Sequence, residues 1–210
     1  MDENILKDKN KKYSCKLVLS IPTKLQTFVD FLDDTRMIML TQRNKEGGKV
    51  TKPDRVAKKK ITKNREEFIK VFNEFESFKN NTNVPLRIYS CVNKRNIDKA
   101  IREFKYRMLE ADYYDEISRR SFYYDIKNRW MSCVMSPTSR AETNFIIDID
   151  DNNLTVKTLR ELQSLKVKVI LHYNTKNGSH VVTEPFNPNL LKTKYPELGI
   201  AKDGLLLLSY

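Results

Sequence analysis

The 210-residue sequence predicts an α+β fold, in which helices pack on a mostly antiparallel sheet within one domain. Three observations predict it. Hydrophobic residues make up 40% of the chain, which is enough for a core. Segments with a two-residue apolar period alternate with segments of helical period. The strongest hairpin signal, Asn177–Gly178, lies between two apolar stretches, as expected for antiparallel neighbours.

Residues 1–83 are expected to form an α/β half that contains two strands, two helices and a basic segment. Residues 14–22 and 36–42 have the apolar character of strands, and residues 23–34 repeat apolar side chains at helical spacing. The basic stretch that follows contains glycine and proline breakers, which predict either a long hairpin tip or a disordered loop. Residues 64–79 repeat phenylalanine and valine at helical spacing and predict an amphipathic helix.

Residues 84–210 continue with strands and helices. A strand is predicted over residues 84–92, and two helical regions are predicted over residues 96–114 and 115–133. The order of the remaining elements is strand, helix, strand, strand, and then an apolar run. Their expected ranges are 144–150, 155–165, 167–174, 180–183 and 204–209.

The positive charge of the chain is concentrated in one segment. The net charge is +12, and ten Lys and Arg against two acids lie between Arg43 and Arg65. Such a local field favours a polyanion such as nucleic acid, although a solvated loop would have the same composition. The residues expected to contact a nucleic-acid backbone are Arg43, Lys49, Lys52, Arg55, Lys58, Lys59, Lys60, Lys63 and Arg65.

A pair of acids ends the apolar strand at residues 144–151. In a strand, side chains two residues apart share a face, so Asp148 and Asp150 are expected to project together while Ile149 enters the core. Two neighbouring carboxylates repel each other and favour a cation between them, and hard oxygen ligands suit Mg²⁺ or Mn²⁺. The alternative is a strand that simply ends in a polar turn.

The hairpin carries the second candidate group. His180 opens its return strand after Gly178, a residue that allows the backbone to approach a ligand closely. Lys176 and Ser179 add a charge and a hydroxyl, and together these residues could hold the phosphates of a nucleotide. The other histidine, His172, lies within an apolar alternation and is expected to be structural.

The order of these pieces resembles the catalytic core of the archaeo-eukaryotic primase superfamily, which includes the primase-polymerases. In that family a hydrophobic strand ends in Asp-x-Asp or Asp-x-Glu, and a later strand carries a small residue, any residue and His. Asp148, Asp150 and the sequence Gly178-Ser179-His180 match these motifs. The resemblance covers roughly residues 84–209.

The resemblance implies an RRM-like sheet in residues 84–210, beside the α/β half. It implies that Asp148 and Asp150 bind Mg²⁺ or Mn²⁺ and that His180 contacts the phosphates of an NTP or dNTP. The family expects a third acid at a later strand, and Asp203 is the candidate. The implied activity is template-directed nucleotidyl transfer that makes short primers on single-stranded DNA. A separate replicative helicase is a further expected partner.

Two other functions remain open at this point. One is a catalytically degenerate replication accessory protein that binds nucleic acid, and the other is a metal-dependent nuclease. The sequence lacks the P-loop pattern and the closely spaced histidine pair of rolling-circle endonucleases. Ser179 and His180 are strand neighbours that face opposite ways, so they cannot form a hydrolase pair.

The expected location is the cytoplasm of a bacterial or phage-infected cell. The N-terminal segment is charged and lacks the apolar core of a signal peptide, and no apolar run approaches the length of a membrane span. Cys15, Cys91 and Cys133 are odd in number and widely spaced, which indicates a reducing compartment and no zinc site. No membrane partner is expected.

Overall fold

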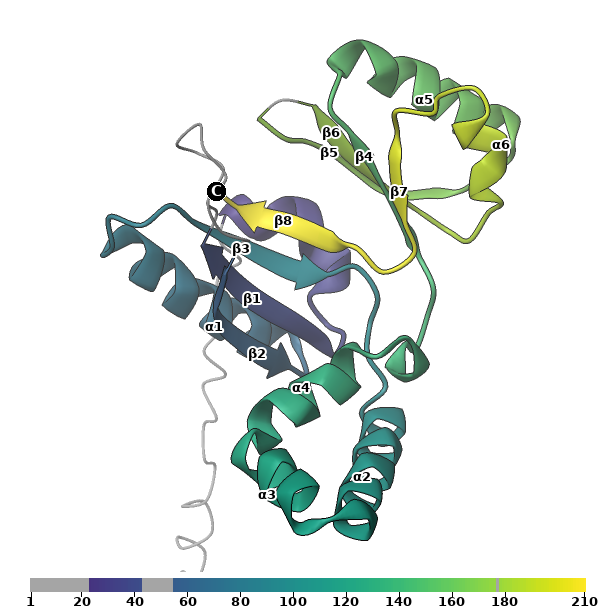
Figure 1. Ribbon diagram of the computed structural model, residues 1–210. Coiled ribbons are helices and arrows are strands. Elements are labelled where there is room, and N and C mark those ends of the chain that lie inside the picture. Colours follow the sequence, from purple (N-terminus) through teal and green to yellow (C-terminus); the bar gives the residue numbers. More distant parts are fainter. Residues whose placement is uncertain (1–22, 43–54, 177) are drawn as a thin grey trace, which may run out of the picture.

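Two four-stranded antiparallel sheets and their helices form the α+β fold that the sequence predicts (Figure 1). The computed structural model describes residues 23–42, 55–176 and 178–210. The strand predicted over residues 14–22 lies outside these ranges.

The first sheet has the strand order β2-β1-β3-β8. Its strands are β1 (Arg36–Gln42), β2 (Arg55–Thr62), β3 (Leu86–Cys91) and β8 (Leu205–Ser209). The 3₁₀ helix η1 (Thr23–Phe31) and helix α1 (Arg65–Asn80) supply the apolar side chains that fill the core on one face of this sheet. The basic segment was predicted to be a hairpin tip or a loop, but its second part is the edge strand β2, because it pairs with β1 along its whole length.

The start and the buried face of helix α1 are determined by its local sequence. Asn64 caps its first turn, since the side chain of Asn64 accepts a hydrogen bond from the Glu67 amide at 2.9 Å. Phe68, Phe72 and Phe75 recur at helical spacing and are fully buried. The amphipathic helix predicted from this spacing is confirmed.

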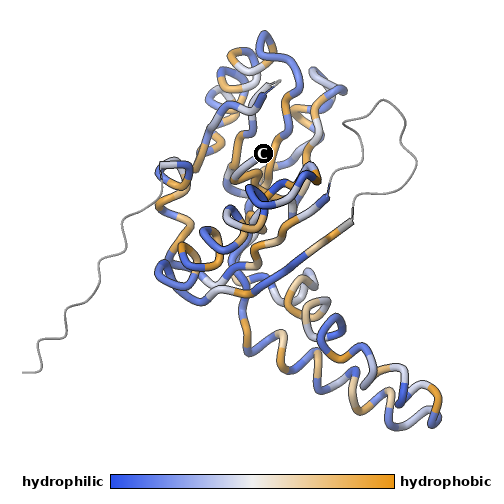
Figure 2. The backbone as a smooth tube through the Cα atoms, turned by 90° about the vertical axis from the view of Figure 1, so that its left-hand side faces the viewer, coloured by the Kyte–Doolittle hydropathy of each residue, from blue (hydrophilic) through white to orange (hydrophobic). Residues whose placement is uncertain are grey.

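A helical module follows β3. It consists of α2 (Ile97–Tyr114), α3 (Glu116–Tyr124), α4 (Ile126–Met135) and the 3₁₀ turn η2 (Pro137–Ser139). The second predicted helix is in fact two helices that meet at Asp125. Met131 of α4 packs on the first sheet, while α2 and α3 project away from both sheets, as Figures 1 and 2 show.

The second sheet has the strand order β5-β6-β4-β7, and every neighbouring pair is antiparallel. The chain runs strand, helix, strand, strand, helix, strand, which with this order is the RRM-like arrangement that was expected. The elements are β4 (Phe145–Ile149), α5 (Asn152–Ser164), β5 (Val169–Asn174), β6 (Ser179–Thr183), α6 (Pro188–Lys192) and β7 (Gly199–Ala201).

The RRM-like part is narrower than predicted, because β3 and β8 belong to the first sheet. On one face of the second sheet, Ile147, Ile149 and Val181 pack against Leu162 of α5 and Leu191 of α6. On the other face, side chains of β4 and β6 join the core of the first sheet. The helices therefore cover one face, while the opposite face is shared by the core of the first sheet and by the acids and the histidine. None of the helices in the described ranges has the length and apolar character needed to span a bilayer.

Candidate functional site

Asp148 and His180 lie directly opposite each other on β4 and β6. Ile147 and Ile149 point into the helix-covered core, so the alternation of the strand turns Asp148 to the other face of the sheet. The Nε2 atom of His180 is 2.9 Å from Oδ1 of Asp148. The Asp148 side chain is 58% exposed and the His180 side chain only 13%, so the histidine is held in place while the acid faces solvent.

Tyr173 on β5 fixes which nitrogen of His180 carries the proton. Its hydroxyl oxygen accepts a hydrogen bond from the Leu207 amide at 3.1 Å and is 2.7 Å from Nδ1 of His180. Burial raises the pKa of Tyr173, so the phenol keeps its proton, and because its oxygen already accepts from Leu207 this proton is directed to Nδ1. In neutral His180, Nε2 then carries the hydrogen and donates it to Asp148.

Tyr173 was not predicted as part of the site. A two-residue turn at Asn177–Gly178, as the sequence predicts, would set Thr175 opposite His180. The structure instead pairs Tyr173 with His180, so the register differs by two residues from that prediction. The hairpin signal predicts only that Tyr173 lies on the same face of the sheet as His180.

Asp150 follows β4 and lines the same pocket as Asp148 and His180. The pocket has a volume of about 570 Å³, and Lys176 of the hairpin also lines it. Its other wall comes from helix α1 and from strands β3 and β8 of the first sheet. This wall includes two basic residues, Lys79 and Arg87, together with Tyr89, Leu205 and Leu207. The pocket thus lies between the two sheets and combines two acids with several basic side chains.

Gly178 brings the hairpin close to the acids. A Cβ atom at this position would lie 1.8 Å from the Ile149 carbonyl oxygen, so only glycine allows the turn to approach the end of β4. Its role is this close approach of the two backbones.

The structure corrects the role expected for Ser179. Its side chain is fully buried, and its hydroxyl lies 2.8 Å from the Thr155 hydroxyl on α5. The alternation of β6 turns Ser179 to the helix-covered face and His180 to the pocket. Ser179 therefore anchors β6 to α5 and places no hydroxyl in the pocket.

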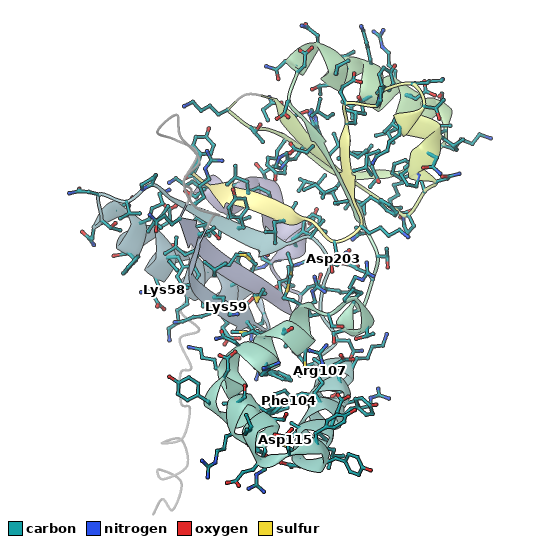
Figure 3. The ribbon with its side chains drawn as sticks, in the orientation of Figure 1. Lys58, Lys59, Phe104, Arg107, Asp115 and Asp203 are labelled. Atoms are coloured by element: carbon teal, nitrogen blue, oxygen red, sulfur yellow. The ribbon has the colours of Figure 1, made fainter. Side chains whose placement is uncertain are left out.

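The structure also corrects the role expected for Asp203, on the loop between β7 and β8 (Figure 3). Its Oδ1 atom accepts hydrogen bonds from Arg95 at 2.5 Å and from Asn93 at 3.2 Å. Asn93 also accepts a hydrogen bond from the Asn144 amide, which is roughly 13 Å of extended chain from Asp148. Asp203 is therefore paired at the far end of β4 and is not a third ligand beside Asp148 and Asp150.

The donors in the pocket suit a magnesium or manganese ion held jointly by protein and substrate. Within the described ranges there is no group of three or more His, Cys, Asp or Glu side chains placed to hold a metal. Mg²⁺ is commonly bound by one or two carboxylates together with water and substrate phosphates. Asp148 and Asp150 on one pocket meet that smaller requirement.

Several of the predicted nucleic-acid contacts have partners within the chain. Lys58 lies 3.8 Å from the centre of the Phe78 ring, Lys60 pairs with Glu74 at 2.6 Å, and Arg65 pairs with Asp33. Arg43, Lys49, Lys52 and the side chain of Arg55 lie outside the described residues.

Successive side chains of β2 point alternately to the two faces of the first sheet. Lys58 and Lys60 face α1, so Lys59 lies on the opposite face. A groove of about 1010 Å³ passes around the β2 edge of the sheet, from α1 on one face to α4 on the other. Its basic lining residues are Lys58, Lys59, Lys60, Lys70 and Lys127, and its acidic ones are Glu67 and Glu74. Figure 3 labels Lys58 and Lys59 near the edge of the sheet. Lys63 is exposed beside the start of α1.

Comparison with known proteins finds no relative of this chain. The chain matches no protein-family model, and no curated protein or solved structure is significantly similar to it.

Proposed function

We propose that the protein is a primase or primase-polymerase that joins NTP or dNTP substrates on a single-stranded DNA template. The observation that supports this most is the convergence of Asp148, Asp150 and His180 on one pocket. These three residues belong to the two motifs in which the sequence resembles the archaeo-eukaryotic primases. The RRM-like strand order around them agrees with the same resemblance.

The charges of the pocket fit a nucleoside triphosphate. Lys176 and Arg87 line it together with the two acids, and so does Lys79, whose ammonium pairs with Glu76 at 3.2 Å. A guanidinium group can bind a phosphate with two parallel hydrogen bonds, and a lysine supplies a compact positive charge. A triphosphate carried with a divalent cation would balance the charges of both kinds of side chain.

The tautomer of His180 favours phosphate over metal as its ligand. A histidine binds a metal through a nitrogen lone pair, whereas Nε2, 2.9 Å from Asp148, carries a hydrogen in the tautomer in which Tyr173 donates to Nδ1. That N–H can instead donate to a phosphate oxygen. The structure thus supports separate roles, with His180 holding phosphate and the acids holding the cation.

Asp148 and Asp150 are the residues that would hold Mg²⁺ or Mn²⁺. When bound, such a cation neutralises the charge that develops on the reacting phosphate and on the leaving pyrophosphate. The remaining steps depend on the chain itself, because Tyr173 orients His180 and the basic side chains Arg87 of β3 and Lys176 of the hairpin position the triphosphate. The basic side chains of β2 are the proposed contacts of the template backbone.

The test is de novo primer synthesis on single-stranded DNA with labelled NTPs or dNTPs and Mg²⁺ or Mn²⁺. We expect short products from the wild type and none from Asp148→Asn/Asp150→Asn, a loss of at least about 100-fold. Glu197→Gln removes an exposed acid between α6 and β7. It serves as the matched control, and its activity should be unchanged.

Two results would contradict the proposal. One is a wild type that makes no product with either metal, and the other is an active Asp148→Asn/Asp150→Asn variant. Shortening of the labelled DNA instead of new product would identify a metal-dependent nuclease.

A nucleic-acid-binding accessory protein is the second candidate, and the pairing of Asp203 with Arg95 favours it. With that acid neutralised by a buried cation, the pocket has two carboxylates where the resemblance implies three. This candidate predicts no primer synthesis, together with salt-dependent DNA binding that is weakened by Lys59→Ala and unaffected by Asp148→Asn.

A further inference from the structure

The outer face of α2 carries a row of large exposed side chains. Tyr106, Leu109 and Tyr113 are 69%, 65% and 85% exposed, and Arg102 precedes them in the same row. The steps between the four residues are four, three and four, which place all of them on one side of a helix. We call these four residues the α2 stripe.

The helical module does not use the α2 stripe for its own packing. The opposite side of α2 carries the buried Ala100 and also Phe104, whose ring lies 5.5 Å from Phe122 of α3 and 5.7 Å from Trp130 of α4. Phe104 and Arg107 are labelled in Figure 3 on the inner side of the module. The stripe is therefore a second apolar face on a helix whose first face is already packed.

No described part of the chain covers this face. Within residues 23–42, 55–176 and 178–210, α2 packs against α3, α4 and η2, and Figures 1 and 2 show the α2–α3 hairpin extending away from both sheets. The three stripe side chains alone expose roughly 450 Å². This is a little over half of the roughly 800 Å² that each partner buries in a standard interface, an area that suits a weak, concentration-dependent contact.

The charge of the module favours a protein as the partner. Eight basic and seven acidic residues lie between Ile97 and Met135, so the module is almost neutral in a chain with a net charge of +12. A surface that binds polynucleotides needs a positive field, which this one lacks. Tyrosine and arginine, by contrast, dominate the energetic centres of protein interfaces.

The order of the α2 stripe makes it complementary to itself. The steps of four, three and four residues read the same in both directions along the helix. If a second copy of α2 lies antiparallel across a two-fold axis between Tyr106 and Leu109, each Tyr106 faces the Leu109 of the other copy. Each Arg102 then faces the Tyr113 of the other copy, which is a cation–π pair.

We propose that the α2 stripe is the contact between two copies of this chain, packed antiparallel through α2. The contact lies far along the chain from the pocket residues and is independent of the proposed nucleotidyl transfer. Its test therefore needs no activity.

The test measures the mass of the full chain by light scattering and sedimentation over about 1–100 μM protein. We expect a concentration-dependent dimer for the wild type. Leu109→Glu should weaken self-association at least tenfold, because it sets a carboxylate against the Tyr106 ring of the other copy. Leu190→Glu makes the same change at an exposed leucine of α6 and should leave the mass unchanged.

A second-site change tests the register. Tyr106→Lys added to Leu109→Glu places a lysine opposite each new glutamate and should restore the dimer. Far-UV circular dichroism checks that each variant keeps its helices. A wild type that stays monomeric up to 100 μM would overturn the proposal, as would a dimer that Leu109→Glu leaves intact. A Leu109→Glu variant that loses DNA binding while its mass is unchanged would instead assign the stripe to nucleic acid.

Discussion

Two aspartates near opposite ends of β4 differ in exposure and in their partners. At the carboxyl end, Asp148 is largely exposed on a pocket and accepts a hydrogen bond from a histidine. Near the amino end, Asp203 pairs with Arg95, whose side chain is fully buried. Asp148 can therefore bind a cation from solution, whereas the carboxylate of Asp203 is already neutralised by the buried guanidinium of Arg95.

The largest effect on stability is expected at the buried pair. Arg95→Met keeps the apolar stem but leaves Asp203 without its cation, and we expect the free energy of unfolding to fall by about 3 kcal/mol. Asp148→Asn should change it by less than about 1 kcal/mol, because that acid is mostly exposed. Urea denaturation measures both.

The same pair can be removed as a unit. Arg95→Met/Asp203→Leu leaves no unpaired charge and should recover part of the loss. If Arg95→Met alone were as stable as the wild type, the distinction drawn between the two ends of β4 would be wrong.

A glycine lies close to each end of β4, and the two are expected to differ. Gly178→Ala would bring a Cβ atom against the Ile149 carbonyl oxygen, a backbone atom, and should destabilise the protein by about 3 kcal/mol. Gly204→Ala meets Cγ2 of Ile146 at 2.1 Å, a side-chain atom that can move, so about 1–2 kcal/mol is expected. Only Gly178→Ala should also weaken nucleotide binding, as measured by titration with a fluorescent nucleotide. Equal effects on binding would contradict the role assigned to Gly178.

A smaller effect than that of Gly178→Ala is expected at Tyr173. Tyr173→Phe leaves the Leu207 amide without this acceptor and should cost about 1–2 kcal/mol of stability. It also removes the donor to Nδ1 of His180. We therefore expect the ¹⁵N NMR signals of His180 to show a single Nε2–H tautomer in the wild type and a mixture in the variant. A tautomer unaffected by the substitution would show that Tyr173 does not orient His180.

Much of the fold was predictable because its signals are local. The phenylalanine spacing of α1, the alternation of β4 and the hairpin between β5 and β6 each lie within one short segment, and the structure has all three. Strand β2 was not predicted as a strand, because its sequence RVAKKKIT reads as a charged segment and only pairing with β1 makes it one. The short strand β7 depends on β4 in the same way.

The site was predictable to a similar degree. Strand alternation predicts that Asp148 and Asp150 share a face, but their meeting with His180 in one pocket depends on the pairing of β4 with β6, which are separated by α5 and β5 in the chain. The ion pair between Asp203 and Arg95 was not predictable from the sequence, since Arg95 lies 108 residues earlier in the chain. The burial of Ser179 followed from alternation alone, which also placed His180 on the opposite face.

The site can form only after strand β8 has been synthesised. Strand β8 completes the edge of the first sheet beside β3, and its Leu207 amide holds the Tyr173 hydroxyl that orients His180. The acids and the histidine can be placed by the second sheet alone, but the oriented histidine needs residues about 30 positions further along the chain. On a ribosome the pocket therefore stays incomplete until residues 205–209 have been made and have paired with β3. Binding of a nucleotide to a nascent chain should begin only then.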